Sequence, residues 1–363
     1  MRISIKRDDL LLGIQSVIGA ITQKNTLPIL LNVLLEVNNN VKITATDLDI
    51  GITATIDARI HEKGAVTVPA KRFADIIKEL PNTEIEIIAK KNNTIIIKTE
   101  TTTFKILTTP KDEFPQLPKP TTIEEMTINQ KDLKQMLLAT TFAMSRDETR
   151  YVLNGICFTI SKNNITLIAT DGRRLSIIKH KQATNTQEEK KYIIPTKTTQ
   201  ELLKNLNETE QTKIQFSKNQ VTFYLNNLHI VSRLVEGEFP DYKQAIPKEA
   251  DKKLIIERNK LIPAIKRASL LTTPESQAIK LQLTKNKLVV SKTTPEIGET
   301  KEEIEVKYTG NDLLVGFNPT YLQEALKSIK QDIVEIELTG PDKPGVIRIG
   351  DTYTYIVLPM QIT

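Results

Sequence analysis

Two short apolar runs near the start of the chain decide the fold, because the same pair returns about 124 positions later. The first pair is Val33-Leu34-Leu35-Glu36-Val37 with Ile43-Thr44-Ala45-Thr46-Asp47, and the second is Ile156-Cys157-Phe158-Thr159-Ile160 with Leu167-Ile168-Ala169-Thr170-Asp171. A weaker third copy covers 279–283 and 288–290. In each copy, two runs of alternating apolar and polar residues flank a polar turn, which predicts a β-hairpin with one buried face.

Helical patterns repeat with the same period as the hairpins. Apolar residues spaced i, i+3 and i+4 predict two amphipathic helices in each third of the chain, within 8–22, 70–80, 129–144, 196–206, 258–272 and 318–330. Asp8, Asn129 and Asn318, the last followed by Pro319, are the predicted N-caps. The order helix, strands, helix, strands has no long crossover helices between successive strands. It therefore favours an α+β fold with antiparallel sheets.

Two Pro-rich polar stretches separate the three copies. Glu113-Phe114-Pro115 and Glu238-Phe239-Pro240 lie 125 positions apart. We expect linkers here, and domain boundaries that divide the 363 residues into 1–120, 121–248 and 249–363. Duplication of one ancestral unit is the simplest account of three such tandem repeats.

The positive charge of the chain is concentrated on the predicted helices. The chain has 50 Lys and Arg and 44 Asp and Glu, a net charge of +6, and the six helix windows alone hold 13 basic and 7 acidic residues. Lysines on one exposed helix are ordinary, but basic residues on five duplicated helices predict a shared surface that faces a polyanion such as nucleic acid. The sequence has no zinc finger, basic zipper or RNP motif, so we expect contacts to phosphates without sequence readout.

Patterns for catalysis or metal binding are scarce. The 13 glycines form no nucleotide-binding loop, and the three histidines have no metal-ligand spacing with the single Cys157, so we expect no cofactor and no metal. Cys157 lies in an apolar strand and is interpreted as a core residue. Asp47 and Asp49 form a candidate metal pair, but aspartates at strand ends more often make Asx turns, and Asp171-Gly172 is predicted to be such a turn.

The compartment and the last residues of the chain each support a prediction. A single cysteine, charged residues near the N-terminus and the lack of an apolar run of about 18 residues predict a cytoplasmic protein. Residues 355–363 stay apolar almost to the last position. They are either a final edge strand or one wall of an apolar groove for a partner peptide.

Six strings of residues, in order along the whole chain, resemble the bacterial DNA polymerase III beta subunits, the sliding clamp family. They are Thr26–Leu30, Val68–Phe73, Arg150–Gly155, Ala169–Leu175, Glu238–Tyr242 and Tyr355–Met360. The resemblance implies the DNA clamp fold, with a head-to-tail homodimer that forms a six-domain ring around double-stranded DNA. It also implies a non-catalytic processivity factor whose partners are the replicative polymerase catalytic subunit, the clamp loader and other proteins with clamp-binding motifs.

The resemblance also assigns site residues. Carried over by position, the DNA-facing residues are Lys24, Arg72, Arg150 and Lys197, and helix position adds Lys71, Lys134, Lys266 and Arg267. The implied partner-peptide groove consists of Leu153, Thr170, Gly172, Arg174, Leu175, Pro240, Val346, Ile356, Leu358, Pro359 and Met360. The implied dimer interface sets Phe104 of one subunit against Leu270 and Leu271 of the other.

Two departures from the family pattern leave the peptide preference open. Gln244 and Ala245 stand where the family often has a basic residue and a larger aliphatic residue, and Met360 is followed by Gln361 where Arg is frequent. Two other functions compete with the clamp. One is a monomer whose repeats lie along DNA as an open arc, and the other is a metal-dependent nuclease that uses Asp47 and Asp49.

Overall fold

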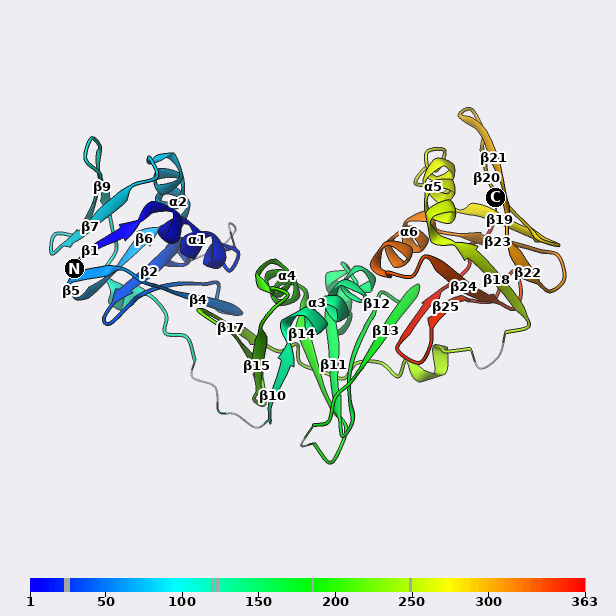
Figure 1. The fold of residues 1–363 in the computed structure, drawn as a ribbon, viewed down its shortest axis with the longest axis horizontal. Coiled ribbons are helices and arrows are strands. Elements are labelled where there is room, and N and C mark those ends of the chain that lie inside the picture. The colour runs from blue at the N-terminus through cyan, green and yellow to red at the C-terminus, as the bar shows by residue number, and fades with distance from the viewer. Residues whose placement is uncertain (23–26, 119–120, 122–123, 185, 248–249, 363) are drawn as a thin grey trace. The chain divides into compact units, whose positions relative to one another are not determined.

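The computed structural model describes residues 1–22, 27–118, 121, 124–184, 186–247 and 250–362 (Figure 1). The chain forms two compact units. Unit 1 consists of Met1–Lys134 and Lys197–Leu234, and unit 2 consists of Gln135–Thr196 and Val235–Thr363. Among the described residues, no helix has the length and apolar character needed to cross a membrane.

Unit 1 contains two antiparallel sheets. The five-stranded sheet has the order β5 (Arg59–Glu62), β1 (Arg2–Lys6), β7 (Glu84–Lys90), β8 (Thr94–Lys98), β9 (Thr103–Leu107). The eight-stranded sheet has the order β10 (Glu124–Asn129), β15 (Gln211–Phe216), β16 (Gln220–Leu225), β17 (Leu228–Arg233), β4 (Ile50–Ile56), β3 (Val41–Thr46), β2 (Asn32–Val37), β6 (Gly64–Pro69). The helices that accompany these sheets are α1 (Arg7–Ile18), α2 (Ala70–Glu79), α4 (Thr196–Asn205) and the first part of α3 (Gln130–Leu138).

Unit 2 has the same organisation. Its nine-stranded sheet has the order β14 (Lys190–Pro195), β11 (Gly155–Ser161), β12 (Asn164–Thr170), β13 (Arg174–Lys181), β26 (Tyr353–Val357), β25 (Gly345–Ile349), β24 (Ile333–Leu338), β18 (Lys252–Glu257), β22 (Lys307–Thr309). The four-stranded sheet has the order β21 (Gly298–Glu305), β20 (Lys287–Thr294), β19 (Ile279–Thr284), β23 (Leu313–Phe317). Its helices include α5 (Arg258–Ser269) and α6 (Pro319–Ser328).

The three predicted hairpins are confirmed. β2 pairs with β3, β11 with β12 and β19 with β20, all antiparallel and in the predicted positions. Each of the six predicted helix windows also contains a helix. The α+β fold with antiparallel sheets therefore follows from local periodicity, since both kinds of element recur in three tandem copies.

The same strand pairing joins neighbouring repeats in both units. In unit 1, β17 pairs with β4, with Ile230 opposite Ile52, and in unit 2, β26 pairs with β13, with Tyr355 opposite Ser176. β4, β13 and β21 begin at 50, 174 and 298, which are 124 positions apart, and β9, β17 and β26 begin at 103, 228 and 353, which are 125 apart. β9 and β21 are thus the third copies of the two joining strands. Each of them lies at the edge of its sheet.

The helix starts agree only in part with the predicted caps. The Asp8 prediction is wrong, because α1 begins at Arg7 with Lys6 as its N-cap and Asp8 lies in the first turn. Asn318 caps α6 as predicted, since its side-chain oxygen accepts a hydrogen bond from the Thr320 amide at 2.9 Å. Asn129 directly precedes α3, and its amide group donates to Asp132 Oδ2 at 3.2 Å.

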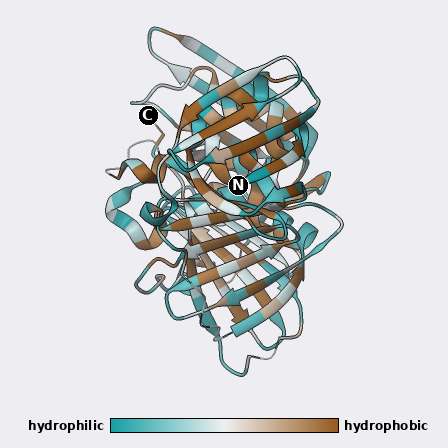
Figure 2. Cartoon of the chain, turned by 90° about the vertical axis from the view of Figure 1, so that its left-hand side faces the viewer, coloured by the Kyte–Doolittle hydropathy of each residue, from teal (hydrophilic) through white to brown (hydrophobic). Residues whose placement is uncertain are grey.

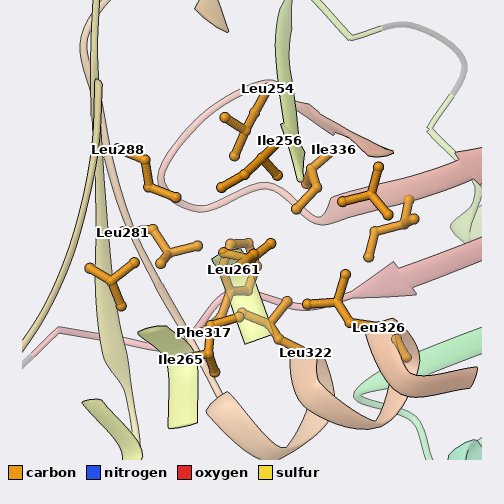
Figure 3. Packing of buried hydrophobic residues seen from close by; sticks show 14 of the residues in the cluster. Leu254, Ile256, Leu261, Ile265, Leu281, Leu288, Phe317, Leu322, Leu326 and Ile336 are labelled. Carbon is orange, nitrogen blue, oxygen red and sulfur yellow. The ribbon is translucent and has the colours of Figure 1, made fainter. Parts of the chain in front are cut away.

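Aliphatic side chains from helices and sheets fill the cores. Hydrophobic and hydrophilic residues alternate along many strands (Figure 2), as expected for sheets with one buried face. In the C-terminal repeat, Leu261 of α5 and Leu322 and Leu326 of α6 point into one cluster with Phe317 of β23 (Figure 3). Burying each Leu contributes about 2 kcal/mol, so this packing holds both helices against the sheets.

Candidate partner groove and DNA-facing residues

A tight turn between β12 and β13 positions the first part of the predicted groove. Asp171 Oδ1 accepts hydrogen bonds from the backbone nitrogens of Arg173 at 2.9 Å and Arg174 at 3.0 Å. Gly172 has a φ of 87°, a conformation that L residues with a side chain rarely adopt. The Gly172 amide donates to Thr170 Oγ1 at 3.1 Å. The turn predicted at Asp171-Gly172 is therefore confirmed.

Four predicted groove residues form one row across four strands. Thr170 lies opposite Leu175, Leu175 opposite Ile356, and Ile356 opposite Val346. Residues directly opposite one another in an antiparallel sheet project from the same face. Leu175, Ile356 and Val346 also belong to one buried apolar cluster. The structure thus brings together groove residues that are up to 186 positions apart in the sequence.

The linker that contains the second Glu-Phe-Pro string packs over this row. Phe239, Tyr242 and Ile246 pack on the cluster, and burial raises the pKa of the Tyr242 hydroxyl to about 12. The three apolar residues of the row are only 1–4% exposed. They form the floor of the predicted groove, and the exposed Pro240 lies within the covering linker.

The segment after β26 supplies a further wall. The Leu358 amide donates to the Arg173 carbonyl oxygen at 2.9 Å, and the Met360 amide donates to the Gly316 carbonyl oxygen at 2.8 Å. A Cβ atom at Gly316 would lie 2.6 Å from the Met360 oxygen, so a side chain there would displace the segment. Leu358 is 42% exposed, whereas Pro359 and Met360 are half-buried. The alternative prediction of a final edge strand is wrong, because β26 lies between β13 and β25.

Arg174 does not lie on the row. It precedes Leu175 on β13, so its side chain projects from the opposite face of the sheet. The guanidinium binds the Glu324 carboxylate and the Phe142 carbonyl oxygen, and its Nε donates to Asp171 Oδ2 at 3.1 Å. It also lies 4.2 Å from the centre of the Tyr321 ring. Arg174 therefore ties the turn to α6.

Leu153 and Arg150 come from the short 3-10 segment Glu148–Leu153. Leu153 is buried at the end of this segment. Arg150 Nη1 donates to the Asp171 carbonyl oxygen at 3.4 Å. Arg150 also lines a cavity of about 410 Å³ together with Arg146 and Arg173. The predicted DNA-facing Arg150 therefore lies beside two further arginines, neither of which was predicted to be a site residue.

Lys197, another predicted DNA-facing residue, is held by protein atoms in unit 1. Its ammonium donates to the Ala20 carbonyl oxygen at 2.7 Å, to Thr22 Oγ1 at 2.7 Å and to Asp47 Oδ2 at 2.6 Å. We call these four residues the Lys197 clasp. Burial raises the pKa of the Asp47 carboxyl, but hydrogen bonds, above all the one from Lys197, outweigh this and keep the pKa below its usual value. The clasp joins the start of α4 to the first repeat.

The other predicted DNA-facing residues differ in whether protein atoms already bind their charged groups. Lys134 Nζ donates to the Leu206 carbonyl oxygen at 2.9 Å, just beyond the end of α4. The Arg267 guanidinium makes two hydrogen bonds to the Glu302 carboxylate, at 2.7 Å and 2.5 Å. Lys24 lies outside the described residues. The remaining three are exposed on helices and have no acidic partner in the described part of the chain: Lys71, Arg72 and Lys266.

The predicted dimer-interface residues are apolar and accessible in their own units. Phe104 lies on the edge strand β9 and is 36% exposed. Leu270 directly follows α5 and is 75% exposed, and Leu271 is half-buried. Contiguous apolar surface that remains exposed often marks an interaction site.

Comparisons with known proteins agree over the whole length. The family models for the N-terminal, central and C-terminal domains of the DNA polymerase III beta subunit match residues 1–118, 127–241 and 243–361. The chain is 31% identical to the beta sliding clamp of Chlamydia muridarum, covering 100% of this chain and 99% of that protein. The chain belongs to the beta sliding clamp family.

Two more members of the family show the same full-length agreement. The beta sliding clamp of Staphylococcus aureus is 34% identical, and the aligned region covers 99% of this chain and 99% of that protein. The crystal structure of the Pseudomonas aeruginosa DNA polymerase III beta subunit superposes with a TM-score of 0.95 at 30% identity, and both chains are fully covered. The predicted clamp fold with three domains is therefore confirmed.

Beta sliding clamps are processivity subunits without catalytic activity, so the nuclease hypothesis is wrong. The geometry gives the physical reason at the candidate metal pair. Asp47 Oδ1 accepts from the amides of Asp49 at 3.1 Å and Ile50 at 3.0 Å, and its other oxygen is in the Lys197 clasp. The described residues contain no group of three His, Cys, Asp or Glu that could hold a metal ion. Cys157 is buried, and burial raises the pKa of its thiol to about 11.

Sequence reasoning missed two features of the clamp sites. Phe239, Tyr242 and Ile246 cover the groove floor. The repeated Glu-Phe-Pro string signalled that this linker is special, but not which face it covers. Nothing in the sequence indicated that other protein atoms bind the Lys197 ammonium, because its partners Ala20 and Asp47 are 177 and 150 positions away.

Proposed function

We propose that two copies of this chain associate head to tail into a six-domain ring around double-stranded DNA. The ring slides along the duplex and tethers the catalytic subunit of the replicative polymerase. The observation that carries this proposal is that two strands, β9 and β21, lie at sheet edges although their other copies pair between repeats. β9 and β21 are the third copies of strands that pair at both internal junctions, and both lie at sheet edges.

Pairing β9 of one subunit with β21 of the other would repeat the junctions β17–β4 and β26–β13. Because β9 and β21 belong to different ends of the chain, the contact is head to tail, and two such contacts close a ring. Four glutamates lie on β21, and β9 carries Lys105, so the charges favour this pairing. Phe104, Leu270 and Leu271 would become buried there.

The helices supply the DNA-facing surface of the proposed ring. Within their observed bounds they hold 13 Lys and Arg and 7 Asp and Glu, the whole surplus of the chain. Contacts from lysine and arginine to phosphates are independent of sequence and weaken with salt. Such contacts permit sliding, because no position on the duplex is preferred. The residues we assign to this surface are Lys24, Lys71, Arg72, Lys134, Arg150, Lys197, Lys266 and Arg267.

The groove residues, from Leu153 to Met360, would bind short peptides of the polymerase catalytic subunit, the clamp loader and other proteins with clamp-binding motifs. An apolar floor, a covering linker and the exposed Leu358 support this assignment. We place the domain boundaries near 120 and 248, close to the gaps between the three matched family models. We infer that the protein is cytoplasmic, because DNA, its proposed partner, lies in the cytoplasm of bacteria.

Retention on circular DNA tests the ring. After loading, a closed ring stays on a nicked circle and is lost when the circle is cut, since it slides off the ends. Sedimentation equilibrium should give about 82 kDa, twice the 41.0 kDa of one chain. A monomer that dissociates equally from circular and linear DNA would favour the open arc and refute the ring.

Deleting residues 358–363 tests the groove. We expect the variant to lose binding of the polymerase catalytic subunit and to keep its sedimentation mass. The physical reason is that the deletion removes the wall formed by Leu358, Pro359 and Met360 and leaves β9 and β21 unchanged. Retained binding would refute the groove assignment but not the ring.

A further inference from the structure

A second hollow adjoins the groove floor on the same face of the nine-stranded sheet. Val346 of the floor lies opposite Glu337 on β24, and Glu337 lies opposite Lys253 on β18. Arg348, two residues after Val346 on β25, projects from this face as well. The hollow has a volume of about 690 Å³, and its walls come from the linker, with Lys243, and from these strands.

The described residues that line this hollow carry more positive than negative charge. Three of its residues are cationic, namely Lys243, Lys253 and Arg348, and Glu337 is its one acidic residue among those described. Arg348 is held in place, because its Nε donates to Glu337 Oε2 at 2.8 Å and its Nη2 donates to the Pro247 carbonyl oxygen at 3.0 Å. These contacts fix the guanidinium between the linker and the strand, which reduces the cost of ordering it on binding.

Of the two lysines in the hollow, only Lys253 has an acidic partner among the described residues. Lys253 is exposed and pairs with Glu335 at 2.7 Å, a residue outside the lining of the hollow. Lys243 is exposed, and its ammonium has no acidic partner in the described ranges of the chain. Lys243 therefore supplies the uncompensated positive charge of the hollow.

We propose that this hollow, the basic pocket formed by Lys243, Lys253, Glu337 and Arg348, binds an acidic side chain of a partner peptide whose apolar residues occupy the groove. The inference rests on the groove assignment and adds a charge preference to it. A carboxylate suits the pocket because Lys243 and the fork of Arg348 both donate hydrogen bonds. An apolar peptide residue would leave these groups desolvated without a partner.

Sheet geometry sets where the acidic residue must lie in the peptide. Adjacent strands are about 4.8 Å apart, so Glu337 and Lys253 lie about 5 and 10 Å from Val346 across the sheet. An extended peptide advances about 3.3 Å per residue. The acidic residue is therefore expected two to four positions from the apolar residue that enters the groove beside this floor.

Selection from a random 12-residue peptide library on the full-length protein tests the inference. We expect selected peptides to share apolar residues and an Asp or Glu two to four positions away. The double variant Lys243→Ala, Lys253→Ala should bind a selected acidic peptide about fivefold more weakly, and the same peptide with Ser for the acid should bind both proteins equally. Lys287→Ala is the matched control, because Lys287 is also an exposed strand lysine, paired with Glu303 at 2.9 Å.

The outcomes separate this inference from the groove assignment. Peptides that require residues 358–363 but carry no acidic preference would overturn the basic pocket and leave the groove standing. Equal binding of the acidic peptide to the double variant and to the Lys287→Ala control would overturn it as well. Peptides that bind the 358–363 deletion as tightly as the intact chain would overturn the groove assignment, and the basic pocket with it.

Discussion

Replacing Lys197 by methionine should destabilise unit 1 by about 2 kcal/mol. The methionine keeps most of the apolar stem and removes the ammonium, which bonds to Ala20, Thr22 and Asp47. A hydrogen bond to a charged group contributes about 1.5–3 kcal/mol. The Lys197 side chain is 34% exposed and that of Asp47 is 10% exposed, so solvent screening places the expected loss toward the lower end of this range.

The loss stays moderate because Asp47 keeps other partners in the variant. Its carboxylate still accepts hydrogen bonds from Thr22 and from the amides of Asp49 and Ile50. The burial of an unpaired carboxylate, which costs more, is thereby avoided.

The effect of Lys197→Met should depend on pH in one direction. The Lys197 ammonium and the other hydrogen bonds hold the folded-state pKa of Asp47 below its usual value, so the stabilisation is present above about pH 4 and is lost as the pH falls through the folded-state pKa. The difference in stability between the two proteins should therefore be constant near neutral pH. It should shrink below about pH 4, as Asp47 becomes protonated in both proteins.

Hydrogen exchange is the suitable assay, because a chain of several domains does not unfold in one two-state step. A loss of about 2 kcal/mol corresponds to hydrogen exchange about 30-fold faster for those α4 amides that exchange only after the Lys197 clasp has broken. Lys78→Met is the matched control, since Lys78 is an exposed lysine in the last turn of α2 in the same unit. Unchanged α4 exchange in Lys197→Met at pH 7, or a difference that grows on acidification, would refute the reasoning.

Two further predictions concern the ring and its DNA surface. Replacing Leu270 and Leu271 together by Ala should weaken the dimer by about 2–5 kcal/mol, because each Leu loses buried area at the interface. Sedimentation at decreasing protein concentration measures this loss, and Leu12→Ala, on the exposed side of α1, is the control. A double variant that keeps the same mass as the control at every concentration would contradict the prediction. Lys266→Ala should reduce the slope of log affinity for a short duplex against log salt by about 1, because its ammonium has no acidic partner among the described residues. Lys197→Met should reduce the slope by less, because Asp47 already neutralises part of the Lys197 charge. Equal slopes for both variants would show that the clasp does not decide which lysines reach DNA.

The elements and the repeat could be predicted because their signals are local. Apolar periods of two and of about 3.6 residues specify which residues face a core, and this holds for the hairpins β2–β3 and β11–β12 and for all six helix windows. The Asp8 cap failed for a non-local reason. Lys6 pairs with Glu84 in the sheet, and the Arg7 amide donates to the Thr83 carbonyl oxygen at 3.1 Å. The strand β1 therefore runs directly into α1, and no separate capping turn forms at Asp8.

The groove could be predicted only as a set of residues. Alternation along β13 and β26 predicts that Leu175 and Ile356 each lie on a buried face, and the resemblance placed both in one site. Their position opposite each other depends on the pairing of β13 with β26, which are about 180 residues apart in the sequence. The same pairing makes β26 an interior strand, and local sequence contains no information on which strand will lie next to it.

Residue types and their spacing were thus sufficient for the three repeats, the clamp family and the excess of basic helices. The tertiary structure decided which of those basic residues are free, because Lys197 and Arg267 meet acceptors from distant segments while Lys266 meets none among the described residues. It also decided that the linker covers the groove floor and that Lys253 and Arg348 share a pocket beside it. The physical reason is that periodicity specifies a face, whereas the partner on that face is set by chain segments brought together only on folding.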